Sequence, residues 1–156
     1  MAANAIRANS LYTIVAGPSW TQAEASAVGL GGHLVTISGG EENSFITSAF
    51  DEVPSVSVDG LALFIGLTDK DTERTWKWSS QSSVGYINGA SGEPNSGGGY
   101  VADAEDYAVI YPTAIKYGVS GVWNDIDDIP ALVNSGIAEI PLNLSITCLL
   151  YTYDAA

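Results

Sequence analysis

The sequence predicts an α+β fold, a single domain in which two helices are separated from most of the strands. Apolar residues recur at helical spacing twice in the first third of the chain, over 20–30 and 41–50. Short apolar runs typical of strands lie before and after these helices and do not alternate with them. This segregation is typical of α+β domains. A length of 156 residues is large enough for one domain with its own core.

The first helix is predicted from its start and stop signals. A strand over Leu11–Val15 comes before it and ends at Gly17-Pro18. Ser19 is a suitable N-cap for a helix that runs from Trp20 to Leu30. The apolar positions expected on its buried face are Trp20, Ala23, Ala27 and Leu30, and the glycines that stop it are Gly29, Gly31 and Gly32.

The second helix is predicted to open at Ser38–Glu41, with acids in its first turn that favour the positive end of the helix dipole. Its expected buried residues are Phe45, Ile46, Ala49 and Phe50. A loop over 54–60 and an apolar strand over 61–67 follow. Beyond Thr68 the chain is irregular and rich in glycine, and long loops of this kind are usually functional or disordered. The last strands are expected over 106–111, 121–124 and 137–141.

Charge and hydropathy exclude some partners. The net charge is −13, so the chain offers no basic patch for nucleic acid. No apolar run approaches the roughly 18 residues of a membrane helix, and we predict no membrane span. Residues 1–10 lack the apolar core of a secretory signal.

Three short clusters of oxygen-bearing side chains suggest a site for calcium. They are Glu93-Pro94-Asn95, Glu105-Asp106 and Trp123-Asn124-Asp125. Calcium takes about six to eight oxygen ligands from carboxylates, carbonyls and water. A cis peptide at Pro94 would aim the side chains on either side of it the same way. The alternative is that these are polar turn residues, since loops are rich in such residues for reasons of turn geometry alone.

In this order, the motifs resemble those of the C-type lectin domain, in the version that binds mannose-like sugars through calcium. The upstream landmarks are Trp20-Thr21-Gln22-Ala23, Gly31-Gly32-His33-Leu34-Val35-Thr36-Ile37, Glu41-Glu42-Asn43, Phe64-Ile65-Gly66-Leu67 and Trp76-Lys77-Trp78. The resemblance covers residues 11–141. It leaves 1–10 as an N-terminal segment and 142–156 as an extension of unknown role. It implies a C-type lectin-like fold with two helices, small antiparallel sheets and a long calcium-binding loop region.

The resemblance also implies roles for particular residues. The expected ligands of the principal calcium ion are Glu93, Asn95, Glu105, Asn124 and Asp125, and all of these except Asp125 would also hydrogen-bond two vicinal sugar hydroxyls. Glu-Pro-Asn implies sugars of the mannose, glucose or fucose type. An auxiliary calcium ion would use Asp69, Glu73 and Asp106. The family has an Asp where this chain has Ser96, which would weaken the auxiliary site; Asp69 and Glu73 alternatively belong to a solvated turn.

Cysteine usage departs from the family, whose members usually carry two disulfides. Cys148 is the only cysteine, so no intrachain bridge forms. The matching positions are Ala27 with Ala138, and Tyr107 with Asp128. The alanine pair suggests that packing has replaced one bridge. The pattern also suggests a bacterial or phage-type relative.

The remaining aromatic and histidine residues are expected to be structural. Trp76, Trp78 and Trp123 are predicted to be core residues rather than binding platforms. His33, the only histidine, has no evident partner for catalysis.

The predicted function is calcium-dependent binding of mannose-type glycans by a non-enzymatic module at the cell surface or outside the cell. The alternative is a structural or self-assembling surface or adhesin subunit that uses the same fold without binding sugar. The loop from Asn95 to Glu105 is longer than is usual in the family, and its Asp103 could compete as a ligand. This altered loop and the apolar run over 144–153 favour the alternative, which predicts a homo-oligomer or filament. Fold resemblance alone establishes neither function.

Overall fold

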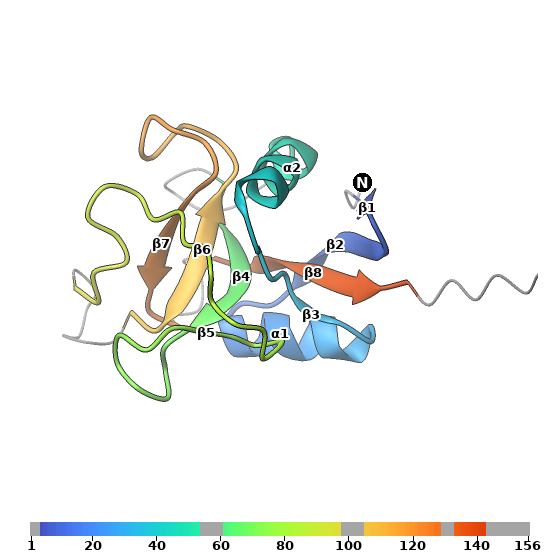
Figure 1. Ribbon diagram of the computed structural model, residues 1–156, viewed down its shortest axis with the longest axis horizontal. Coiled ribbons are helices and arrows are strands. Elements are labelled where there is room, and N and C mark those ends of the chain that lie inside the picture. The colour runs from blue at the N-terminus through green and yellow to red at the C-terminus, as the bar shows by residue number, and fades with distance from the viewer. Residues whose placement is uncertain (1–3, 54–60, 98–104, 129–132, 143–156) are drawn as a thin grey trace, which may run out of the picture.

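The computed structural model describes residues 4–53, 61–97, 105–128 and 133–142, and the predicted α+β class is confirmed (Figure 1). The elements in chain order are β1 (Asn4–Arg7), β2 (Ser10–Ala16), α1 (Trp20–Gly29), β3 (His33–Leu34), α2 (Gly40–Phe50), β4 (Leu63–Thr68), β5 (Lys77–Trp78), β6 (Tyr107–Tyr111), β7 (Val122–Ile126) and β8 (Ser135–Pro141). The predicted loop over 54–60, the run over 144–153 and Cys148 lie outside the described residues.

The strands form one connected sheet in the order β1-β2-β8-β4-β6-β7, with β3 paired to β8 and β5 paired to β4. All strand pairings are antiparallel except the single bridge between Phe64 and Gly136, which joins β4 to β8 in parallel. The small antiparallel sheets expected from the sequence are therefore connected into one mixed sheet. The N-terminal segment contributes β1, which the sequence did not predict because its outward side chain, Ile6, is 66% exposed and no apolar alternation marks the strand.

Helix α1 begins as predicted and ends one residue earlier. The Ser19 hydroxyl accepts a hydrogen bond from the backbone N–H of Gln22, so Ser19 is the N-cap. Trp20, Ala23 and Ala27 are buried. Leu30 was expected on the same buried face, and this prediction is wrong, because Leu30 is the C-cap and is 52% exposed. The helix ends before its side chain would return to the buried face.

Helix α2 buries polar residues as well as apolar ones. Ile46 and Phe50 are fully buried, whereas Phe45 is only partly covered. Asn43 is also buried, and its side chain accepts a hydrogen bond from Trp123 Nε1 at 2.8 Å and donates one to the carbonyl of Gly121 at 2.9 Å. The helix is therefore fixed to the start of β7 by an amide as well as by its apolar face.

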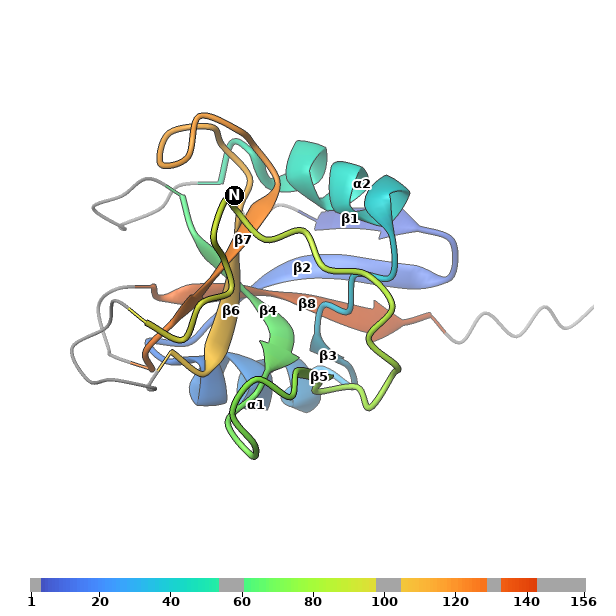
Figure 2. The same cartoon turned by 60° about the vertical axis from the view of Figure 1, so that its left-hand side comes forward.

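The two helices cover opposite faces of the sheet (Figures 1 and 2). One core cluster contains Ile46 and Phe50 of α2, and the other contains the buried residues of α1. Ala27 and Ala138, the positions that match a family disulfide, are both fully buried in the second cluster. The expectation that packing occupies the place of that bridge is confirmed.

The tryptophans largely follow their predicted role. Trp78 and Trp123 are each 2% exposed and meet edge to face, with ring centroids 5.9 Å apart. Trp76 is half-buried against the same cluster. His33 is exposed, and its Nδ1 lies 2.8 Å from Glu24 Oε1. Because Glu24 also accepts the backbone N–H of Leu34 at 2.8 Å, the histidine belongs to a contact that fixes β3 to α1.

Candidate metal centre

The loop before residue 98 is anchored on the end of β7 by a buried carboxylate. Asp125 is fully buried. Its two oxygens each lie 3.1 Å from the backbone nitrogen of Asn95, and one accepts the N–H of Ser96 at 2.7 Å. The Glu93–Pro94 peptide is cis, the form considered for it in the sequence analysis. The first and third sequence clusters are thus brought together although about thirty residues separate them.

This close approach requires the glycine at position 89. A Cβ there would lie 2.0 Å from the carbonyl oxygen of Glu93, a distance that no real contact tolerates. On either side of Gly89 the backbone pairs with β7: Trp123 donates to the carbonyl of Asn88, and Ala90 donates to the carbonyl of Trp123, both at 2.8 Å. Gly89 therefore lets the loop lie against both the strand and its own continuation.

Three of the predicted ligands interact through their side chains. The side-chain amide of Asn95 donates a short hydrogen bond to Glu93, and its oxygen accepts the N–H of Gly97 at 2.5 Å. The pKa of Glu93 is raised by burial, then by the charge of Asp125 and a hydrogen bond with it. The carboxylates meet here with little positive charge to balance them.

Glu105 belongs to the same cluster of charges. Burial, followed by the negative charges of Asp125, Asp127 and Glu93, raises the pKa of Glu105 to about 7. This carboxyl is therefore half-protonated near neutral pH unless a cation offsets the repulsion. Asp103, a possible competing ligand in the sequence, lies outside the described residues.

Asn124 carries an unsatisfied oxygen. Its side chain is 8% exposed, and its Oδ1 is buried without a hydrogen-bond partner among the described residues. It lines a small apolar cavity together with Pro94 and Trp123. A buried acceptor without a partner costs about 1–3 kcal/mol, so the position is unfavourable unless a donor or a cation reaches it.

The three residues predicted for the auxiliary site are also neighbours. Asp69 follows β4, and its backbone N–H donates to the carbonyl of Asp106 at 3.2 Å. The pKa of Asp69 is raised by burial and by the charges of Glu73 and Asp106. One oxygen of Asp69 accepts the N–H of Arg74 at 2.8 Å, while the other is buried and has no hydrogen-bond partner within the described ranges.

Asp127 is a member of this region that sequence reasoning missed. It is 6% exposed, and its charge raises the pKa of both Glu105 and Asp106. It thus stands between the principal and auxiliary groups. A signal was present, because residues two apart on a strand share a face, and Asp127 follows Asp125 at that spacing just beyond β7.

The ligand types in this region suit a hard cation, but the side chains are not arranged around a common centre as metal ligands are. Carboxylate and amide oxygens are the ligands that calcium prefers, and the orphaned oxygens of Asn124 and Asp69 are available. Across the ranges that the structure describes, however, no three acidic, histidine or cysteine side chains are placed to hold a metal. Instead, the oxygens of Glu93 and Asp125 engage in hydrogen bonds within the loop.

Comparison with solved structures places the fold among C-type carbohydrate-recognition domains. The carbohydrate-recognition domain of cow CD23 superposes with a TM-score of 0.68 at 26% identity, over 89% of this chain and 93% of that chain. A calcium-independent type II antifreeze protein superposes with a TM-score of 0.68 at 20% identity, over 89% and 92% of the two chains, which shows the fold alone.

The family follows from the sequence match. Residues 17–126 match the lectin C-type domain, and the chain belongs to this family. A perlucin-like protein of Mytilus galloprovincialis is 32% identical over 111 residues, which cover 70% of this chain. The chain spans 63% of that protein and smaller shares of other curated relatives.

These matches are to carbohydrate-recognition domains and lectin-type proteins rather than to enzymes. They do not support the suggested bacterial or phage-type source. No helix among the described residues is long and apolar enough to cross a membrane.

Proposed function

We propose that this domain binds glycans through a calcium ion held by Glu93, Asn95, Glu105, Asn124 and Asp125. The observation that carries the proposal is the buried oxygen of Asn124, which has no hydrogen-bond partner among the described residues and belongs to the residue next to Asp125, the carboxylate that anchors the loop. A bound calcium ion would supply a positive centre that such an oxygen and the neighbouring carboxylates can share.

The side chains at the rim of the loop suit sugar recognition. Glu93 offers acceptor oxygens only, whereas Asn95 offers both a donor and an acceptor. Together with Glu105 and Asn124 they would hydrogen-bond two vicinal hydroxyls of a mannose-, glucose- or fucose-type sugar. Asn95 is exposed, so such a pair of hydroxyls can reach it from solvent. The family match supports the glycan class.

An auxiliary calcium site at Asp69, Glu73 and Asp106 is a second part of the proposal. Its support is the buried, unpartnered oxygen of Asp69 and the mutual repulsion that raises the pKa of Asp69 and Asp106. Ser96, buried close to Asp125, contributes a hydroxyl where the family has a carboxylate, so we expect this second ion to bind more weakly than the first.

The test is a calorimetric titration with calcium followed by a glycan array with and without chelator. Asn95→Ala removes an exposed ligand and should abolish mannose-type binding. Glu41→Gln is the control, because the Glu41 side chain is 98% exposed and lies on α2, outside both groups of proposed calcium ligands. Glycan binding that survives chelator would contradict the proposal, as would equal binding by the two variants.

A location at the cell surface or outside the cell follows from the expected affinity. Extracellular calcium modules bind with dissociation constants of ~10⁻⁴ to 10⁻³ M, and we expect this site in that range because no intrachain disulfide fixes its loops and Ser96 replaces a carboxylate. Such a site fills outside the cell and stays empty in cytosol. A calcium dissociation constant below about a micromolar, in the range of cytosolic sensors, would contradict this placement.

The second candidate is a structural or self-assembling surface subunit that does not bind sugar. One observation favours it, namely that the described acids are not placed to hold a metal. This candidate predicts homo-oligomers in chelator and no glycan retention on the array. Sedimentation velocity in chelator distinguishes the two candidates, because the lectin proposal does not require self-association.

A further inference from the structure

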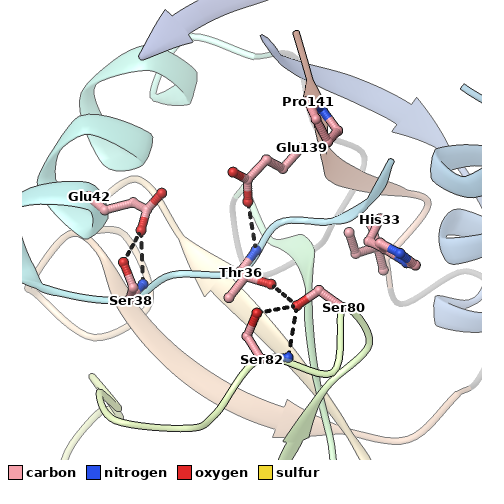
Figure 3. Close-up of a pocket in the computed structure, with 9 residues that line it drawn as sticks. His33, Thr36, Ser38, Glu42, Ser80, Ser82, Glu139 and Pro141 are labelled. Carbon is pink, nitrogen blue, oxygen red and sulfur yellow. Dashed lines mark hydrogen bonds between the residues drawn. The ribbon is translucent and has the colours of Figure 1, made fainter. Parts of the chain in front are cut away.

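A pocket of about 340 Å³ lies between α2, β3 and β8, and it shares no residue with the loop site (Figure 3). Its size is at the lower end of small-molecule sites. Its polar walls are formed by Thr36, Ser38, Glu42, Ser80, Ser82 and Glu139, and Pro141 adds an apolar surface.

Two carboxylates form one wall, and they share a single hydroxyl donor. Tyr12 Oη lies 2.9 Å from Glu42 Oε1 and 3.3 Å from Glu139 Oε1. A hydroxyl has one proton, so it cannot satisfy both acceptors fully. Burial and the two glutamates raise the pKa of Tyr12, which keeps this hydroxyl protonated. Ser10 Oγ also donates to Glu139 Oε1 at 2.9 Å, and the N–H of Thr36 donates to Glu139 Oε2 at 3.4 Å. Because a carboxylate can accept about four hydrogen bonds, the donors among the described residues leave acceptor sites open on the two carboxylates.

The charge of this wall is only partly balanced. Arg7 Nη1 lies 3.9 Å from Glu42 Oε1, beyond hydrogen-bond distance. His33 is directed to Glu24 and not to the pocket's carboxylates. Glu42 is nevertheless only 7% exposed, and a buried carboxylate gains most from a close donor that carries positive charge.

The facing wall presents a directed chain of hydroxyls. Ser80 Oγ donates to Ser82 Oγ at 3.1 Å. Because the single proton of Ser80 is used there, Thr36 is the donor in the 2.7 Å contact between Thr36 Oγ1 and Ser80 Oγ. Ser82 ends this series of hydrogen bonds, and its own proton is directed to no acceptor among the described residues, so it can be donated to a ligand. Ser82 is exposed at the mouth of the pocket.

The wall of carboxylates suits an ammonium better than a metal ion. Glu42 Oε2 already accepts the N–H of Ser38 at 2.9 Å and its hydroxyl at 2.7 Å. Calcium would need about six to eight oxygen ligands, and the described residues that line the pocket supply two carboxylates. An ammonium instead donates three hydrogen bonds and accepts none, which matches Glu42, Glu139 and one hydroxyl oxygen.

We propose that this pocket binds a protonated amine with a neighbouring hydroxyl group, as in a 2-amino sugar that lacks its N-acetyl group. The ammonium donates to Glu42 and Glu139, the neighbouring hydroxyl accepts the proton of Ser82, and the apolar face of the ring packs on Pro141. This function lies beyond the calcium-dependent one and does not depend on it, since no lining residue is a proposed calcium ligand.

The test is a titration of the full chain with glucosamine, followed by NMR at about pH 6 with chelator present. N-acetylglucosamine and glucose are the comparison ligands, because both keep the ring and lose the ammonium. N-acetylglucosamine carries a neutral and bulkier amide in its place, and glucose carries a hydroxyl of similar size. We expect both to bind at least roughly tenfold more weakly than glucosamine, in line with the loss of charge-assisted hydrogen bonds. Ethylamine tests whether the neighbouring hydroxyl matters.

The variants separate the pocket from general acidity. Glu139→Gln keeps the shape of the side chain and should weaken glucosamine binding at least roughly tenfold. Glu41→Gln is the control, because its side chain is 98% exposed and does not line the pocket. Ser82→Ala removes only an exposed hydroxyl, so it should fold normally and weaken glucosamine while leaving ethylamine unchanged.

Four results would overturn the proposal. The first is equal binding of glucosamine and N-acetylglucosamine, and the second is full binding by a folded Glu139→Gln variant. The third is glucosamine binding that appears only after calcium is added, which would place the amine at the loop site. If ethylamine binds as tightly as glucosamine, the assignment of an amino sugar is wrong.

Discussion

Replacing two buried asparagines by leucine should have opposite effects on stability. Asn124 and Asn43 are 8% and 6% exposed, so the leucine side chain would be buried to a similar extent at both positions. The oxygen of Asn124 has no hydrogen-bond partner among the described residues, whereas the amide of Asn43 bonds to both Trp123 and Gly121. The same chemical change therefore removes an orphaned acceptor at one site and a satisfied amide at the other.

The magnitudes follow from these partners. At Asn43, Trp123 Nε1 loses its acceptor, while the carbonyl of Gly121 keeps a 2.7 Å bond from Asn88. One orphaned buried donor costs about 1–3 kcal/mol, so Asn43→Leu should lose about 2 kcal/mol, or about 4–8 °C in Tm. At Asn124 the unsatisfied oxygen is removed, and we expect stability without calcium to be unchanged or up to about 1 kcal/mol higher.

Urea unfolding with chelator, repeated in calcium, measures both effects. Calcium at a hundred times its dissociation constant should stabilise the wild type by ~2.7 kcal/mol. Asn124→Leu should lose most of this gain, whereas Asn43→Leu should keep it. Equal destabilisation of the two variants in chelator would refute the assignment of an orphaned oxygen at Asn124. If Asn124→Leu is stabilised by calcium as much as the wild type is, Asn124 is not a calcium ligand.

Three further outcomes are expected. The pKa of Glu105 is raised to about 7 in the folded protein, so the calcium-free form binds more protons than the unfolded chain. Its stability should therefore fall as pH rises from about 4.5 to 7. Thermal scans in chelator measure this fall, and Glu105→Gln should make the melting temperature depend less on pH. Gly89→Ala places a Cβ 2.0 Å from a carbonyl of the loop and should weaken calcium at least roughly tenfold by titration, whereas Gly85→Ala, with nothing within 4 Å, should not. Exchanging Glu93 and Asn95 for Gln and Asp should lower mannose-type retention on the array, and a sugar profile that does not change would place the pocket elsewhere.

Some features of the fold were readable because their causes are local. Ser19 caps α1 because its hydroxyl reaches an N–H three residues away. The buried residues of α1 and α2 follow the helical period, which depends only on spacing. The prediction that Leu30 is buried was wrong because the end of a helix depends on what packs beyond it. Strand β1 was not predicted because it is held by backbone pairing with β2 and has no apolar alternation.

The sequence by itself determined the family, the α+β class and the grouping of oxygen-bearing residues, because motif order and periodicity are properties of the linear chain. Only the tertiary structure decided which of these oxygens are satisfied: Asp125 accepts two backbone N–H groups of the loop, whereas the oxygen of Asn124 accepts none. The pocket between α2, β3 and β8 also exists only in three dimensions, since Glu42 and Glu139 come from segments about a hundred residues apart. Whether a hydrogen bond forms and what shape a cavity takes depend on distances between segments that are far apart in the sequence. The pairing of β8 with β2 and β3 sets these distances, and no local sequence pattern encodes them.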